Sequence, residues 1–241
     1  MKAVLFDLDR TLLDRDSAIA EYAERLWERW KTPNDPGRVE FVSRFVELDA
    51  RGRGDKQAMF RSLVSEVLSG GDAEVLHQEF EGGFPASVHP FADALPVLQA
   101  LRKEGLLLGV VSNGRGKLQR AKLAGSQLVG LLDVIIISEE IGFRKPAPEI
   151  FHAALEALHC RAEEVVLVGD SEQTDIQGAK AAGMFPVLRR YAGETFPTEA
   201  HREVWSLSDL LALPGLVSEK PSPSEERFAG REANIFRGFR R

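Results

Sequence analysis

An apolar run at the start of the chain, Ala3 to Phe6, ends in two aspartates, Asp7 and Asp9, with one residue between them. A short, continuous apolar run bounded by polar residues is typical of a strand buried on both faces of a parallel sheet. Ligands of such sheets bind beyond the carboxyl ends of the strands, which is where these aspartates lie. Taken alone, the two aspartates could equally cap a following helix, so the rest of the chain is needed to decide between a cap and a functional site.

Helical and strand patterns alternate from about residue 91 to residue 213. The predicted helices cover 91–104, 117–129, 146–158, 176–182 and 208–213, and the predicted strands cover 106–111, 133–137, 165–168 and 185–188. Strands that alternate with helices form right-handed crossovers, which build a parallel sheet covered by helices on both faces. We therefore predict an α/β fold with a Rossmann-like, doubly wound parallel sheet as its core.

The segment between the first strand and this alternating region carries only helical patterns. Apolar residues recur at helical spacing in four stretches, which contain Ile19 to Trp30, Phe41 to Leu48, Met59 to Val67 and residues 72–80. Such stripes most simply form the core of a small helical bundle. The predicted organisation is a core formed by 1–14 and 89–214, an inserted α-helical unit at 15–88, and a tail at 215–241 that begins poor in apolar residues and is expected to be disordered.

Composition narrows the classes of function. The chain of 241 residues has a net charge of -6, whereas nucleic-acid binding favours a basic face, so nucleic acid is not expected as a partner. No apolar run is long enough to cross a bilayer, and Asp7 and Asp9 interrupt the region where a signal peptide would be apolar, so we expect no membrane partner. Cys160 is the single cysteine, which favours a reducing, cytoplasmic location. Both a monomer and a homodimer are compatible with the sequence.

Polar residues follow each strand that is expected to lie near the first one. They are Ser112 and Asn113 after the second strand and Asp170 and Asp175 after the fourth, together with Lys145 at the start of a predicted helix. Pro146, next to this lysine, is suited to the first turn of a helix, so the amine would lie near the positive end of the helix dipole. Each cluster alone could be a helix cap or a solvated group. Their common position at one edge of the sheet instead indicates a site for a phosphate group.

Asp7, Asp170 and Asp175 together predict a metal ion. Carboxylates about 5 Å apart repel one another by roughly 3 kcal/mol per pair at an effective dielectric constant of about 20. A hard dication removes this repulsion, and Mg²⁺ binds through a few carboxylates together with substrate phosphate and water. We therefore expect Mg²⁺ as the cofactor, with Lys145 supplying positive charge to the opposite side of a bound phosphate.

The pair Asp7 and Asp9 can divide the chemistry of phosphoryl transfer. An ionised carboxylate such as Asp7 can attack phosphorus once positive groups withdraw charge from it, which forms an aspartyl phosphate that water hydrolyses. Asp9, two residues on, would give a proton to the leaving oxygen and later take one from water. Because the first role needs a protonated carboxyl, we expect the Asp9 side chain outside the metal shell and its backbone carbonyl turned toward the metal.

Four motifs together resemble those of the haloacid dehalogenase-like hydrolase superfamily. They are Asp7-Leu8-Asp9-Arg10-Thr11-Leu12, Val111-Ser112-Asn113, Lys145-Pro146, and Gly169-Asp170-Ser171 with Asp175, and the resemblance covers residues 3 to about 190. It implies Asp7 as nucleophile and Asp9 as general acid and base. It also implies Mg²⁺ bound by Asp7, the Asp9 carbonyl and Asp170, with Asp175 holding metal-bound water, and a phosphoryl group held by Thr11, Ser112, Asn113 and Lys145. The helical insertion resembles the small helical cap of the phosphatase-type members, which closes over the site.

Arg10 departs from the motif, because glycine is commonest at this position in the family. Glycine relaxes the steric limits on the backbone, so an arginine here predicts an ordinary backbone conformation. The side chain of Arg10 could reach the cap, the substrate or solvent.

The resulting prediction is a Mg²⁺-dependent phosphomonoesterase that hydrolyses a small phosphorylated metabolite through an aspartyl phosphate. A phosphomutase would keep every motif, whereas a haloacid dehalogenase would need neither Asp9 nor the metal. A non-catalytic regulatory protein on this scaffold would be favoured by the loss of a motif residue, and none is lost. In the insertion Arg15, Arg51, Arg53 and Lys56 are candidates to meet a second anionic group on the substrate.

Overall fold

The computed structural model describes residues 1–33, 37–68 and 71–217. Its strands are β1 Ala3–Phe6, β2 Leu107–Ser112, β3 Val134–Ile137, β4 Val165–Gly169, β5 Phe185–Arg189 and β6 Arg202–Val204. Neighbouring strands are parallel, and their order in the sheet is β3-β2-β1-β4-β5-β6. Strand β1 therefore lies between β2 and β4, at the point where the strand order reverses. Doubly wound sheets bind their ligands at this point.

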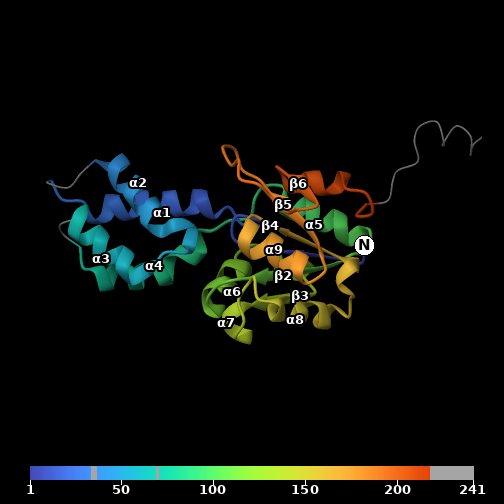
Figure 1. Cartoon of the computed structure of the whole chain (residues 1–241). Coiled ribbons are helices and arrows are strands. Elements are labelled where there is room, and N and C mark those ends of the chain that lie inside the picture. The colour runs from blue at the N-terminus through green and yellow to red at the C-terminus, as the bar shows by residue number, and fades with distance from the viewer. Residues whose placement is uncertain (34–36, 69–70, 218–241) are drawn as a thin grey trace, which may run out of the picture.

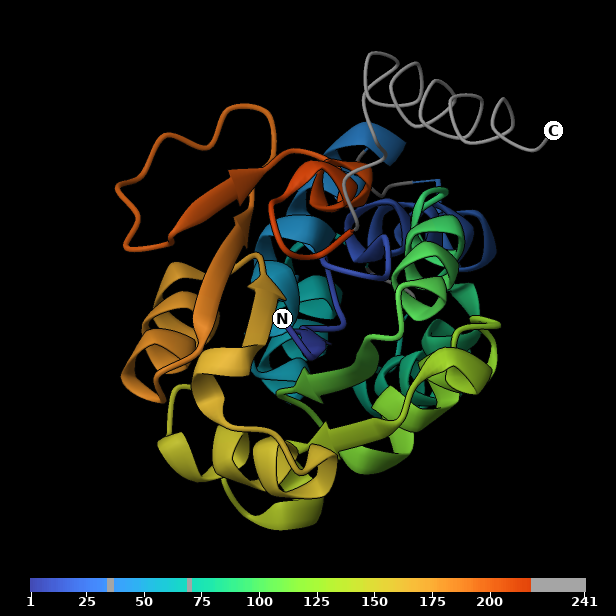
Figure 2. The same ribbon diagram turned by 90° about the vertical axis from the view of Figure 1, so that its right-hand side faces the viewer.

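Helices cover both faces of the sheet (Figure 2). Alternate residues of β1 point to opposite faces, so Val4 and Phe6 belong to one hydrophobic cluster and Ala3 and Leu5 to the other. The first cluster is covered by α5 Ala94–Lys103 and the 3-10 helix η6 Leu207–Ala212, and the second by α8 Pro148–Leu158 and α9 Gln177–Ala181. The predicted doubly wound parallel sheet is confirmed.

A group of helices, which we call the cap, is inserted between β1 and β2 and lies to one side of the sheet (Figure 1). Its helices are α1 Arg15–Trp30, α2 Arg38–Asp49, α3 Lys56–Glu66 and α4 Ala73–Gly83. Asp14 caps the N-terminus of α1, since its side chain accepts a hydrogen bond from the backbone N–H of Ser17. Aromatic rings fill the centre, where Tyr22 meets Phe80 edge-on at a centroid distance of 5.3 Å. The predicted helical insertion is therefore present.

Two segments of chain connect the cap to the sheet, and they lie side by side. The N–H of Asp14 donates to the carbonyl of His89 at 2.8 Å, and the N–H of Phe91 donates to the carbonyl of Leu12 at 3.0 Å. Backbone hydrogen bonds thus join the entry to the cap and the exit from it. The entry segment, Leu12 to Asp14, follows within a few residues of the aspartates that come after β1.

Several elements differ from the sequence prediction. Helix α8 begins at Pro148, so the prediction that Pro146 opens a helix beside Lys145 is wrong. The short helix α7 Ser138–Ile141 and strand β6 are not apparent in the sequence, because 4 and 3 residues carry too little periodicity. Most of the predicted tail, residues 218–241, lies outside the described residues. None of the helices in the described part of the chain combines the length and the apolar character needed to span a membrane.

Candidate active site

Three aspartates meet at the carboxyl edge of the sheet. Asp7 follows β1, and its N–H donates to the carbonyl of Val168 in β4 at 2.8 Å. Asp170 follows β4, and Asp175 lies in the π-helix η5 Glu172–Ile176. One carboxylate oxygen from each of the three aspartates lies within 4.8 Å of the others. The strand order therefore brings together three predicted site residues that come from two separate motifs.

Gly169 allows Asp175 to approach the end of β4. A Cβ atom at position 169 would lie 2.5 Å from the Cβ of Asp175, a distance that non-bonded carbon atoms do not reach. The Oδ2 of Asp175 accepts a hydrogen bond from the N–H of Ser171 at 3.0 Å, and the Ser171 hydroxyl accepts one from the N–H of Thr174. The short segment after β4 thus sets the direction of the Asp175 carboxylate.

Lys145 supplies positive charge to the aspartate cluster. Its Nζ lies 2.6 Å from Oδ1 of Asp7 and 2.6 Å from Oδ1 of Asp175, and it donates to the carbonyl of Val111 at 2.8 Å. Asn113 holds the backbone of this lysine, because its Oδ1 accepts from the Lys145 N–H and its Nδ2 donates to the Lys145 carbonyl. Burial alone would lower the pKa of Lys145, but the charges of Asp175 and Asp7 raise it above its ordinary value. The amine therefore stays charged at neutral pH.

The aspartates themselves are harder to ionise than free carboxyl groups. Burial raises the pKa of Asp7 to about 6 although Lys145 opposes the rise, and the charge of Asp175 adds to it. Burial and then the charge of Asp7 raise the pKa of Asp170 to about 6, against the opposing effect of Arg10. Burial likewise raises the pKa of Asp175. A close set of hard oxygen donors could hold a divalent metal ion, whose charge would favour the ionised forms of these carboxyl groups.

Two of the hydroxyl groups expected to bind phosphate follow the same strands. Ser112 ends β2, and its Oγ accepts a hydrogen bond from Nε2 of Gln119 at 2.7 Å. Thr11 is fully buried, and its Oγ1 has no hydrogen-bond partner among the described residues. An unsatisfied buried hydroxyl is unfavourable, so a ligand that supplied a partner for Thr11 would be stabilised. Phosphate binding by these two residues stays a prediction.

Arg10 has a backbone φ of 63°, so the predicted ordinary conformation is wrong. A left-handed conformation costs a non-glycine residue roughly 1–2 kcal/mol. Ion pairs of the guanidinium offset this cost: Nε lies 2.7 Å from Asp170 and Nη2 lies 2.9 Å from Glu194, while Nη1 pairs with Asp16. The side chain of Arg10 therefore joins one aspartate of the cluster to the first helix of the cap and is not directed into solvent.

Asp9 lies in surroundings that favour its ionised form. Its carboxylate accepts hydrogen bonds from Lys122 at 2.8 and 2.6 Å and from Gln119 at 3.1 Å. Burial would raise the pKa of Asp9, but the charges of Lys122 and Arg15 and these hydrogen bonds lower it. The sequence analysis expected a protonated carboxyl at Asp9. This conformation favours the ionised form instead, because Lys122 pairs with the carboxylate.

Lys122 and Gln119 are site residues that the sequence reasoning missed. Both lie in α6 Gly116–Ala124, three positions apart and therefore on one face, and both are buried. A polar pair on the buried face of the helix that follows Ser112 and Asn113 is the signal that could have identified them.

Most cationic residues expected to meet a second anionic group are paired within the protein. The guanidinium of Arg15 donates to both oxygens of Asp49 at 2.6 and 2.9 Å, and Nζ of Lys56 lies 2.9 Å from Asp49. Arg51 lies 3.1 Å from Glu194, so this pair joins the cap to the sheet domain. Substrate recognition by these residues stays a prediction, and any such role would have to compete with their acidic partners.

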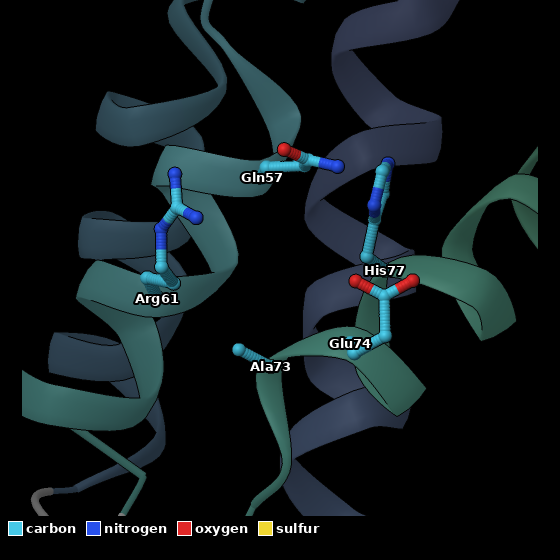
Figure 3. Close-up of a pocket in the computed structure, with 5 residues that line it drawn as sticks. All are labelled: Gln57, Arg61, Ala73, Glu74 and His77. Atoms are coloured by element: carbon cyan, nitrogen blue, oxygen red, sulfur yellow. The ribbon is translucent and has the colours of Figure 1, made fainter.

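A separate hollow of about 270 Å³ lies on the cap between α3 and α4 (Figure 3). It is lined by Gln57, Arg61, Ala73, Glu74 and His77. None of the aspartates at the sheet edge lines it, so we do not place the catalytic chemistry there.

Comparison with known proteins identifies the family. Residues 4–188 match the family model described as haloacid dehalogenase-like hydrolase, a range that contains all four motifs and the cap. The chain belongs to this family. The predicted family membership is therefore confirmed, and the sheet with its cap is the fold of a haloacid dehalogenase-like hydrolase.

Relatives of this haloacid dehalogenase-like hydrolase include phosphatases. A phosphoserine phosphatase of Thermus thermophilus is 33% identical over 165 residues, which are 67% of this chain and 61% of that protein. A glyceraldehyde 3-phosphate phosphatase of Methanopyrus kandleri is 33% identical over 202 residues, which are 79% of this chain and 84% of that protein. The crystal structure of a phosphatase from Thermococcus onnurineus is 29% identical with a TM-score of 0.65, over 90% of this chain and 99% of that one. An L-2-haloacid dehalogenase, 22% identical with a TM-score of 0.68 over 87% of this chain and 97% of that one, shares the fold alone.

Proposed function

We propose that this protein is a Mg²⁺-dependent phosphomonoesterase that hydrolyses a small phosphorylated metabolite through an aspartyl phosphate on Asp7. The observation that carries the proposal is the meeting of Asp7 with Lys145, at 2.6 Å, beside two further aspartates at the end of the sheet. A nucleophilic carboxylate, a fixed cation and a carboxylate set for a metal ion are the groups that phosphoryl transfer requires. Relatives named as phosphatases support the same class of reaction.

The residues present fit a hard divalent cation. The donors are oxygen atoms, and one carboxylate oxygen from each aspartate lies within 4.8 Å of the others. Burial raises the pKa values of Asp7 and Asp170 to about 6, and a divalent cation beside these carboxyl groups would favour their ionised forms. In the proposal Mg²⁺ is held by Asp7, Asp170, the backbone carbonyl of Asp9, and Asp175 through water. When bound, it would neutralise charge on the phosphoryl oxygens and on the attacking carboxylate.

The protein's own residues account for the remaining chemistry. A carboxylate oxygen of Asp7 attacks phosphorus, the bond from phosphorus to the leaving oxygen breaks, and that oxygen takes a proton from Asp9. Water then attacks the aspartyl phosphate and gives a proton to Asp9, so inorganic phosphate leaves and both carboxyl groups are restored. The ionised state favoured at Asp9 is the one needed for this second step. Lys145, Thr11, Ser112 and Asn113 hold the phosphoryl oxygens in this scheme.

The cap has a proposed role in admitting the substrate and limiting water. Residues 15–88 would move as one unit on the linkers near Leu13 and His89, which lie side by side at the base of the cap. The core at 1–14 and 89–214 would carry the reacting groups.

A dehalogenase is less well supported than a phosphatase. Halide departs without a proton, so that reaction leaves the Asp9 carboxylate and the metal-type cluster of Asp170 and Asp175 without a role. A phosphomutase keeps all of these groups, and the same assay separates it, since a mutase returns the phosphoryl group to an organic acceptor and releases little inorganic phosphate.

A phosphate-release screen with Mg²⁺ tests the proposal. The panel contains phosphoserine, glyceraldehyde 3-phosphate, phosphoglycolate, sugar phosphates and an aryl phosphate, and we expect turnover of at least the aryl phosphate. Asp7→Asn should abolish release while the circular dichroism spectrum and melting temperature stay close to those of the wild type. Wild-type turnover by Asp7→Asn would refute the covalent mechanism, and no release from any substrate by the wild type would refute the proposed function.

A further inference from the structure

The Asp9 carboxylate is held by two side chains of a single helix, α6. Nζ of Lys122 donates to both Asp9 oxygens, at 2.8 and 2.6 Å, and Nε2 of Gln119 donates to Oδ2 at 3.1 Å. A carboxylate offers about four acceptor positions, so these three contacts restrict its direction and leave about one position open. The arrangement therefore limits where Asp9 can meet a reacting group.

Gln119 also ties Asp9 to the loop that follows β2. Its Nε2 donates to Oγ of Ser112 at 2.7 Å and to the carbonyl of Asn113 at 3.4 Å. Gly114 leaves room for this side chain, because a Cβ atom at position 114 would lie 2.9 Å from Cγ of Gln119. The same loop holds Lys145 through Asn113, so Asp9 and the lysine beside the nucleophile share one support.

The ion pair with Asp9 explains why Lys122 can be buried. Its side chain is 7% exposed, and its ion pair among the described residues is with Asp9. A buried ammonium group is costly unless it is paired and hydrogen-bonded. The Nζ atom also lies 5.8 Å from the centre of the Phe84 ring at the end of the cap. This lysine therefore lies where the cap, α6 and the turn after β1 meet.

We propose that Lys122 and Gln119 are positioning residues that hold the Asp9 carboxylate in the direction required for proton transfer with the leaving oxygen and with water. The inference rests on the proposed phosphatase function and on the acid–base role of Asp9. Proton transfer requires an oxygen of Asp9 within about 3 Å of the reacting oxygen, and a small displacement slows the reaction strongly. A packed helix places such a group more firmly than a loop does.

Lys122→Met tests the proposal through its dependence on the leaving group. A poor leaving group needs a proton as it departs, whereas a dinitrophenolate does not. We expect kcat/KM to fall about 10- to 100-fold for phenyl phosphate, within the contribution of a well-placed general acid, and less than about 3-fold for 2,4-dinitrophenyl phosphate. The ratio kcat/KM is the suitable quantity because it reports only the steps up to the aspartyl phosphate.

Matched variants separate positioning from a general effect on the fold. Lys122→Arg should restore most of the loss on phenyl phosphate, because it keeps a donor and a charge near Asp9. Lys117→Met, at an exposed position of the same helix, should leave both substrates unchanged. Gln119→Leu should show a smaller fall in kcat/KM with the same dependence on the leaving group. If Lys122→Met does not fold, Gln119→Leu is compared with the wild type in its place.

A double-substitution cycle gives the decisive result. If Lys122 acts through Asp9, then Asp9→Asn combined with Lys122→Met should be slower than Asp9→Asn alone by no more than about 2-fold. Losses that multiply, or a loss from Lys122→Met that is equal for the two aryl phosphates, would overturn the proposal. Failure of the wild type to release phosphate from either aryl ester would overturn the proposed function instead, and this inference with it.

Discussion

Replacing Asp49 by asparagine should destabilise the protein strongly, although Asp49 lies outside the aspartate cluster at the sheet. Asp49 ends α2 and its side chain is 1% exposed. It accepts hydrogen bonds from both terminal nitrogens of Arg15 and from the N–H of Gly52, and it forms an ion pair with Lys56 at 2.9 Å. Asp49→Asn keeps the volume and removes the charge, so the buried Arg15 and the partly buried Lys56 lose the carboxylate that compensates them.

The magnitude follows from the pKa of Asp49. Burial alone would raise this pKa, but the hydrogen bonds and charge of Arg15, together with Lys56, lower it from 3.8 to about 2. At 1.36 kcal/mol per pKa unit, the ionised form is favoured by about 2 to 3 kcal/mol. Removing one partner of a buried ion pair costs about 3 to 5 kcal/mol in other proteins. We therefore expect Asp49→Asn to lower the free energy of unfolding by about 2 to 5 kcal/mol.

The dependence on pH has a defined sign. Because the pKa of Asp49 is lower in the folded state, its contribution is fully present above the unfolded value of about 4 and is lost as the pH falls toward 2. Urea unfolding followed by circular dichroism should give a constant difference between wild type and Asp49→Asn from pH 7 to pH 5. Below about pH 4 this difference should narrow.

An exposed glutamate of the cap provides the control for this prediction. Glu24→Gln in α1 removes a charge without breaking a buried pair and should change stability by less than about 0.5 kcal/mol. If Asp49→Asn behaved like this control at pH 7, the buried pair would contribute nothing and the reasoning would be refuted. A difference that did not narrow in acid would refute the assigned pKa.

Three further predictions concern the metal, the cap and the end of β4. Treatment with EDTA should abolish the turnover of an aryl phosphate, and added Mg²⁺ should restore it. Ca²⁺ should inhibit this turnover, because its coordination shell is larger and less regular than that of Mg²⁺. Full turnover after chelation would contradict the proposed metal site. Arg51→Ala should raise KM for a metabolite several-fold and leave KM for an aryl phosphate nearly unchanged, with stability altered by less than about 1 kcal/mol because the Arg51 side chain is half exposed. Arg38→Ala, at an exposed position of α2, is the control, and equal KM values for the metabolite in all three proteins would exclude the role of Arg51. Gly169→Ala should lower the free energy of unfolding by about 1 to 3 kcal/mol and reduce kcat, because the added methyl group collides with Asp175. An unchanged melting temperature would contradict this close packing.

The sequence by itself determined the class of fold and the grouping of the main site residues. Alternating strands and helices permit few topologies once crossovers are right-handed, so a doubly wound sheet followed from periodicity alone. Asp7 and Asp170 could be grouped because the carboxyl ends of parallel strands share one edge, and the strand pairing of Phe6 with Val168 places them there. Short elements such as β6 were not predicted, because three residues are too few to show a periodic pattern of apolar residues.

Only the tertiary structure decided which side chains meet Asp9 and Arg10. Lys122 is 113 positions from Asp9, and Glu194 is 184 positions from Arg10, so no local pattern connects them. Arg10 also departs from the rule that residues other than glycine avoid a positive φ. Ion pairs with acidic residues distant in the sequence hold it in this conformation. Local periodicity depends on neighbouring residues of the chain, whereas the partner of a buried charge is chosen by packing and Coulomb energy across the whole fold.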